Sequence, residues 1–131
     1  MRHTVFLFGE AERGEFGVPI HLVTLAQLAD VLGNPPPDSQ GISFAVQALL
    51  FERDLIFYRV KEEGFSTHDY MLGLNFLEKR SPTNSLSAIA IPGVGDTEII
   101  DALNPICTLH NTLLIVSEKD LFDYLISPKA I

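Results

Sequence analysis

Apolar residues in this chain gather in short runs bounded by glycine, proline, asparagine or charged residues. Brief apolar runs of about four to eight residues with such boundaries are typical of β-strands. The predicted strands cover residues 3–8, 19–23, 54–60, 87–91 and 112–116. The last three are almost continuously apolar, as strands are when helices cover both faces of a sheet. We therefore expect these three to be adjacent, mostly parallel strands in the core.

The segment between the third and fourth predicted strands has the pattern of a helix, residues 66–80. Ser66 and Asp69 stand at the spacing of a capping box, so the start of this helix is well specified. Phe65 precedes the cap and is placed to pack onto Tyr70 as a hydrophobic staple.

Two further helices are predicted in the second half of the chain. Residues 96–110 form the first, which Pro105 must kink or end because proline lacks the backbone donor and clashes with the preceding turn. Residues 117–127 form the second, with Ser117 as a candidate N-cap.

The first half of the chain gives a less regular pattern. Residues 43–53 favour a helix by composition, but together with 54–60 they could also form a hairpin. Three consecutive prolines in residues 33–41 indicate a rigid loop within the domain. The connection 9–19 holds three glycines and no helical period, which predicts an antiparallel edge or a mobile loop in place of a first crossover.

Alternation of strands and helices predicts parallel strands joined by right-handed crossovers. The expected fold is an α/β three-layer sandwich with a mostly parallel sheet of about five strands, Rossmann-like or flavodoxin-like. The 131 residues suffice for one domain, residues 1–131, and a second hydrophobic core is not expected.

Charge narrows the choice of partner. Nine Lys and Arg residues against 17 Asp and Glu give a formal charge of −8, a field that repels phosphate backbones and anionic lipids. We therefore expect no nucleic acid and no membrane as partners. No apolar run approaches the roughly 18 residues of a membrane span, and the apolar stretch near the N-terminus is too short for a signal peptide, so we expect a cytoplasmic protein.

Metal, thiol and cofactor chemistry are not indicated. The single cysteine, Cys107, lies in an apolar helical stretch, which predicts a packing role and a raised thiol pKa. The histidines lack the close spacing of metal ligands, so we predict no metal site and no cofactor. They are His3, His21, His68 and His110.

The stretch PGVGDTE, residues 92–98, resembles the glycine turn that dinucleotide-binding proteins place before a helix. Its third glycine position holds Glu98, and Asp96 is an N-cap by type, so acidic side chains occupy the helix end that a phosphate would need. We therefore predict a capped helix, with Gly93 and Gly95 as turn residues. Asp96 still follows a predicted parallel strand, where open α/β sheets bind ligands.

Two other strand ends carry candidate side chains. After the last strand stand Ser117, Lys119 and Asp120, which differ from the guanine-reading motif Asn-Lys-x-Asp because Lys119 and Asp120 are adjacent and the chain has no phosphate-binding loop. A helix cap with solvated charges is the favoured interpretation. The loop after the first strand gathers carboxylates that could perform acid–base chemistry if burial separated their pKa values, or could simply be solvated. Its charged residues are Glu10, Glu12, Arg13 and Glu15.

Apolar content is high for a small monomer: 47% of the residues are hydrophobic, and nine are Phe. In the helix 66–80, Leu72 and Phe76 point to a different side from the other apolar residues, so this second face is a candidate interface. The alternative is a helix buried within its own domain.

These patterns lead to two hypotheses. The first is a non-catalytic interaction or assembly module that acts as a homo-oligomer or complex subunit, with itself or another protein as partner. The second is a small-molecule-binding or enzymatic domain whose pocket lies at the strand ends. Clustering of the strand-end side chains in one cleft would favour the second, and their dispersal beside an apolar surface would favour the first. Those side chains are Glu10, Asp96, Ser117, Lys119 and Asp120.

Overall fold

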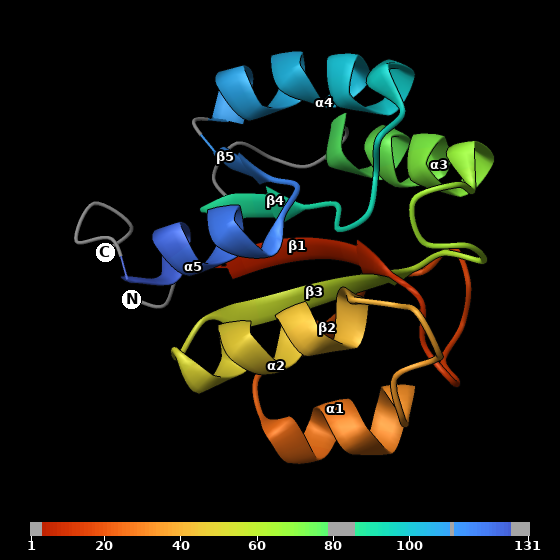
Figure 1. Ribbon diagram of the computed structural model, residues 1–131, viewed down its shortest axis with the longest axis vertical. Helices are drawn as coiled ribbons and strands as arrows, with labels where there is room; N and C mark the ends of the chain where they lie inside the picture. The colour runs from red at the N-terminus through yellow and green to blue at the C-terminus, as the bar shows by residue number, and fades with distance from the viewer. Residues whose placement is uncertain (1–3, 79–85, 111, 127–131) are drawn as a thin grey trace.

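A five-stranded sheet forms the centre of the protein (Figure 1). The computed structural model describes residues 4–78, 86–110 and 112–126. The strand order is β2-β3-β1-β4-β5, and all neighbours are parallel except β2, which pairs antiparallel with β3 at one edge. The strands are β1 (Thr4–Gly9), β2 (Ile20–Leu22), β3 (Asp54–Arg59), β4 (Ala88–Ala90) and β5 (Leu113–Ile115).

Helices cover both faces of this sheet, as the α/β three-layer prediction requires. In Figure 1 the helices α3 and α4 lie above the sheet, and α1 and α2 lie below it. The helix α5 packs on the same core as α1 and α2. Their bounds are α1 (Leu25–Leu32), α2 (Gly41–Leu50), α3 (Thr67–Glu78), α4 (Thr97–His110) and α5 (Glu118–Ile126).

The central strand β1 explains why its sequence is continuously apolar. Val5 and Leu7 point into the core between the sheet and the helices α1, α2 and α5. Phe6 and Phe8 point into the core on the opposite face, between the sheet and the helices α3 and α4. Because successive side chains of a strand alternate between faces, a strand buried on both sides has no position for a polar residue. Phe8 stacks on Tyr70 of α3 with ring centroids 5.2 Å apart, which joins β1 to the helix layer.

Strand adjacency differs from the sequence-based expectation in one respect. The strands β3, β4 and β5 are parallel, as predicted, but β1 lies between β3 and β4. The crossover through α3 therefore passes over β1 before the chain enters the sheet again. Counted along the chain, the parallel strands have the order 2-1-3-4, which is the order of flavodoxin-like folds.

The uncertain first half is resolved in favour of a helix followed by a strand, since α2 ends at Leu50 and β3 begins at Asp54. The antiparallel edge predicted for the connection after β1 is confirmed as β2. The helix α1 was not predicted, although Thr24 and Gln27 form a complete capping box at its start. Its signal is the Thr-x-x-Gln spacing immediately after the edge strand.

The helix α4 continues through Pro105 to His110, so of the two predicted effects of this proline, a kink or an end, the end does not occur. One detail of the predicted helices needs correction. Phe65 does not staple onto Tyr70: its side chain is 77% exposed, whereas Tyr70 is fully buried. The staple fails because the Tyr70 ring turns inward onto Phe8. The last residues of the predicted helices 66–80 and 117–127 lie outside the described residues.

Close packing between α3 and β1 gives a stability prediction. A Cβ atom added to Gly73 would lie 2.3 Å from the Phe8 ring, and that ring is held by its aromatic neighbours. We expect Gly73→Ala to lower the free energy of unfolding by about 1–2 kcal/mol, because overpacking outweighs the better helix propensity of alanine. Urea denaturation measures this change. Gly95→Ala, where no atom lies within 4 Å of the added Cβ, is the matched control and should be close to neutral.

Candidate functional site

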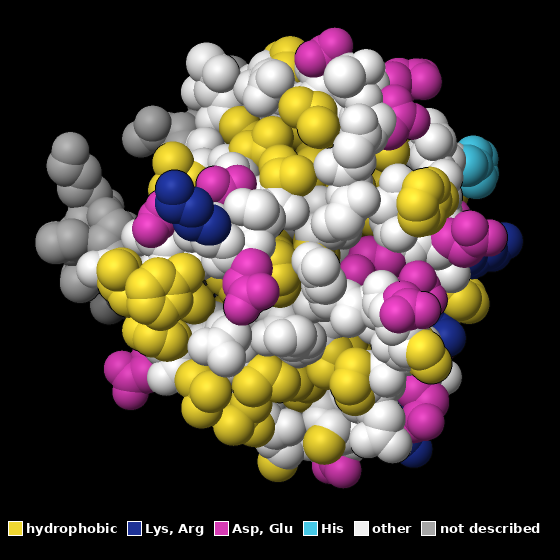
Figure 2. Space-filling view, viewed as in Figure 1, with side chains coloured by type: hydrophobic (Ala, Val, Ile, Leu, Met, Phe, Trp, Pro, Cys, Tyr) yellow, Lys and Arg dark blue, Asp and Glu magenta, His cyan; other side chains and the backbone are white. Residues whose placement is uncertain are grey.

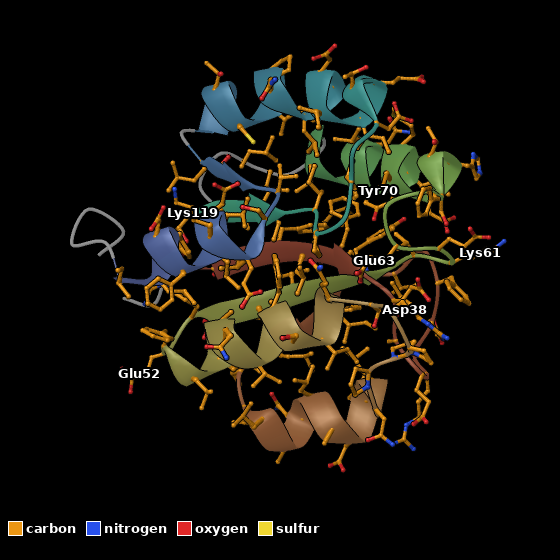
Figure 3. All side chains as sticks on the ribbon, in the orientation of Figure 1. Asp38, Glu52, Lys61, Glu63, Tyr70 and Lys119 are labelled. Carbon is orange, nitrogen blue, oxygen red and sulfur yellow. The ribbon has the colours of Figure 1, made fainter. Side chains whose placement is uncertain are left out.

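The strands β1 and β3 end side by side, with Gly9 in register with Arg59. Open α/β sheets bind their ligands beyond this carboxyl edge, so the loops that follow the two strands form the first candidate site. The loop after β1 begins with Glu10, and the loop after β3 contains Glu63, which lies near the start of α2 (Figure 3).

The Glu63 carboxylate binds the N-terminus of α2. It accepts hydrogen bonds from the backbone N–H groups of Gly41 at 2.8 Å, Gln40 at 2.5 Å and Glu10 at 3.1 Å. In return, the Glu10 carboxylate accepts from the N–H of Glu63 at 2.9 Å. Only glycine fits at Gly41, because a Cβ atom there would lie 2.7 Å from the Glu63 carboxylate. The helix end that could hold a phosphate therefore already holds a carboxylate.

Burial shapes the protonation of this region. The pKa of Glu63 is raised above its ordinary value, mainly because the carboxyl group is buried. The hydrogen bonds from backbone N–H groups lower this pKa, and the nearby charge of Glu10 raises it. Burial also raises the pKa of Tyr70 strongly, against the lowering effect of the Gly64 N–H that bonds to its hydroxyl oxygen. Tyr70 therefore stays protonated at neutral pH and anchors the loop after β3 instead of acting as a base.

The loop after β4 is a capped helix start, as predicted. Asp96 accepts a hydrogen bond from the N–H of Glu98 at 2.9 Å, and its other oxygen lies 3.4 Å from the Thr67 hydroxyl. Gly93 has a φ of +79°, which suits its predicted role in the turn. This loop touches the one after β3, since a Cβ atom on Gly64 would come 2.5 Å from the Gly93 carbonyl oxygen.

The side chains after β5 also cap a helix. The Ser117 hydroxyl accepts from the N–H of Asp120 at 3.2 Å, and the Asp120 carboxylate accepts from the N–H of Ser117 at 3.4 Å. Lys119 is exposed on α5 (Figure 3) and makes no hydrogen bond in these caps. Glu10, Lys119 and Asp120 line three different hollows, so the predicted strand-end residues are dispersed.

Apolar side chains gather instead on the surface shared by α2 and α5, where Figure 2 shows hydrophobic atoms over both helices. Phe122 and Ile126 of α5 are 57% and 55% exposed, and Leu50 at the end of α2 is 56% exposed. Between the helices is a hollow of about 590 Å³ lined by Gln47, Glu118, Lys119, Leu121, Phe122 and Leu125. We call Leu50, Phe51, Phe122, Ile126 and this hollow the α2–α5 surface.

The exposed apolar face of α3, a candidate interface in the sequence, is narrower than predicted. Leu72 is 43% exposed, but Phe76 turns inward and stacks on Phe6 with ring centroids 6.0 Å apart. Helical spacing predicts two apolar faces on α3. The sheet contacts part of the second face as well, because Phe76 packs on Phe6 of β1. The sequence does carry a signal for the α5 part of the α2–α5 surface, because Lys119, Phe122 and Ile126 recur at the spacing of one helix face.

Comparison of the chain with protein-family models, curated proteins and solved structures gives no match. Within the described residues, no helix is both long and apolar enough to cross a membrane, and no three His, Cys, Asp or Glu side chains are grouped to hold a metal ion. Cys107 is buried, and burial raises the pKa of its thiol, in agreement with a packing role. Function must therefore be inferred from the geometry.

The Glu63 cap gives a second stability prediction. Glu63→Ala leaves three N–H donors without their acceptor, so we expect a loss of about 2–3 kcal/mol in the free energy of unfolding. Glu63→Gln should lose less, because its amide oxygen still accepts. Thermal and urea denaturation measure both. Glu62→Ala, at the neighbouring exposed residue, is the control. An equal loss of unfolding free energy in Glu62→Ala would show that the cap is not the cause.

The Asp96 cap gives a third stability prediction. Asp96→Ala should lower the free energy of unfolding by about 1 kcal/mol and leave nucleotide binding no better or worse. Calorimetric titration of the wild type with ATP, GTP and NAD tests the second part. Micromolar binding that is lost on substitution of Gly95 would contradict the capped-helix interpretation.

Proposed function

We propose that this chain is a non-catalytic association module that forms a homodimer through the α2–α5 surface. The observation that carries the proposal is the exposure of large apolar side chains from two neighbouring helices on one side of the molecule. Large apolar side chains that are exposed close together are often covered by a partner, because leaving them in water is unfavourable. The dispersal of the strand-end side chains supports association over catalysis, since Asp96 and Ser117 cap helices and Glu10 binds the loop N–H of Glu63.

A second copy suits this surface by charge. The whole chain carries −8, so two copies repel each other unless they meet where both signs occur. At the rim of the hollow, the cation Lys119 stands beside Glu118, with Asp123 on the next turn of α5. In a two-fold arrangement each contact occurs twice, so Lys119 of each copy would face the acidic residues of the other.

The same charge supports a protein partner over nucleic acid or an anionic membrane. We expect the module to act in the cytoplasm, as the sequence composition suggests.

Sedimentation at micromolar concentration should give a dimer of the wild-type chain. Phe122→Glu combined with Leu50→Glu should give a folded monomer. The fold should survive because both side chains are exposed in the single chain. The dimer should be lost because the new carboxylates would be buried at the interface and would repel those of the second copy. Leu72→Glu places the same charge on an exposed leucine of α3 and should remain dimeric. A wild-type chain that stays monomeric throughout would refute the homodimer.

A further inference from the structure

A hollow of about 360 Å³ opens at the carboxyl ends of β1 and β3, away from the α2–α5 surface. Its volume is within the range of small-molecule sites, and its place is where α/β sheets bind ligands. Its wall is the proline loop between α1 and α2, and the remaining lining comes from the residues that follow the two strands. The main lining side chains are Glu10, Glu12, Phe16, Pro36, Arg59 and Val60.

Arg59 is the charged group with unused binding capacity in this hollow. Its Nη1 and Nη2 groups donate to the carbonyl oxygens of Gly14 and Ala11. A guanidinium has five N–H donors, so three remain. Among the described residues no carboxylate pairs with Arg59, and its buried Nε has no hydrogen-bond partner. A half-buried guanidinium without a counter-ion is well suited to bind a carboxylate.

Two carboxylates line the same hollow. Glu10 uses one oxygen to accept from the N–H of Glu63, and Glu12 uses one to accept from the N–H of Asn34. Within the described part of the chain, the second oxygen of each has no hydrogen bond. Lys61 also borders the hollow, but its side chain extends away from the molecule (Figure 3). Both carboxylates are therefore available to an ammonium group.

Apolar residues make up part of the lining, beside the polar Asn34 and Lys61. The Phe16 ring lies over the Arg59 guanidinium, with the central carbon of Arg59 4.1 Å from the ring centroid. Pro35, Pro36 and Pro37 also line the hollow, and the proline ring fixes the backbone φ angle at each of them. An apolar group of about the size of an amino-acid side chain can pack between the ring and the prolines.

We propose that this hollow binds a free amino acid with an apolar side chain. The ligand carboxylate binds the two remaining Nη donors of Arg59, its ammonium group binds Glu10 and Glu12, and its side chain packs against Phe16 and the proline wall. A simple anion would meet two carboxylates, and a simple cation would leave Arg59 without a counter-ion. A zwitterion satisfies both signs at once.

The test uses three probes of matched shape with the full chain: L-phenylalanine, phenethylamine, which lacks the carboxylate, and 3-phenylpropionate, which lacks the ammonium group. Binding is followed by calorimetry and by NMR shifts of the residues that line the hollow. We expect L-phenylalanine to bind at least about tenfold more tightly than either analogue, because each analogue leaves one charged group of the site unpaired.

Glu10→Gln and Glu12→Gln should each weaken L-phenylalanine binding by about tenfold. Both variants keep an oxygen that can accept the backbone N–H, so the loop should keep its conformation. Glu15→Gln removes a charge from the same loop at an exposed residue outside the hollow, and should bind as the wild type does.

The proposal is overturned if neither L-phenylalanine nor L-leucine binds below about 10 mM, if the two analogues bind as well as the amino acid, or if Glu15→Gln weakens binding as much as Glu10→Gln. The site does not depend on the homodimer. The variant with Phe122→Glu and Leu50→Glu should bind L-phenylalanine unchanged, so failure of one proposal leaves the other intact.

Discussion

One carboxylate, that of Glu63, joins the parts of the carboxyl edge of the sheet. It binds the N–H groups of Gln40 and Gly41, 23 and 22 residues earlier in the chain, and that of Glu10, 53 residues earlier. The N-terminus of α2 thereby docks against the end of β1, so closely that both sides of the contact are glycine. The helix dipole favours a negative group at this point. A burial penalty on the charge opposes this attraction, so the cap is strong only while all three donors reach it.

This arrangement determines which ligands the edge can take. Helix N-termini at the carboxyl ends of parallel strands are natural phosphate sites, but here α2, α4 and α5 are capped by Glu63, Asp96, and Ser117 with Asp120. At each of these helix starts, a side chain already accepts from at least one of the backbone donors that a phosphate would use. A ligand at this edge must therefore bind through side chains, and Arg59 is the half-buried cation that borders a hollow there.

Local patterns predicted most of the fold, because apolar periodicity and capping residues act over a few positions. They identified the five strands, the helices of the second half and the caps at Asp96 and Ser117. They could not place β1 between β3 and β4, because strand pairing is decided by packing between distant segments. For the same reason Glu63 was not selected as a site residue: its three donors are remote in sequence, and Lys-Glu-Glu-Gly looks like an ordinary charged loop. Arg59 left a clearer signal, as a charge directly after the apolar run of residues 55–58.

The helix α2 connects the two proposed surfaces. Gln40 makes no side-chain cap at its start, so the cap comes from Glu63 on another loop. Its buried face packs on the sheet, it contacts α5, and its last residue, Leu50, is exposed. The position of Leu50 relative to Phe122 therefore depends on how α2 is held at its other end. Because that end is fixed at the carboxyl edge, the carboxylate that closes the phosphate position also helps to set the geometry of the proposed association surface.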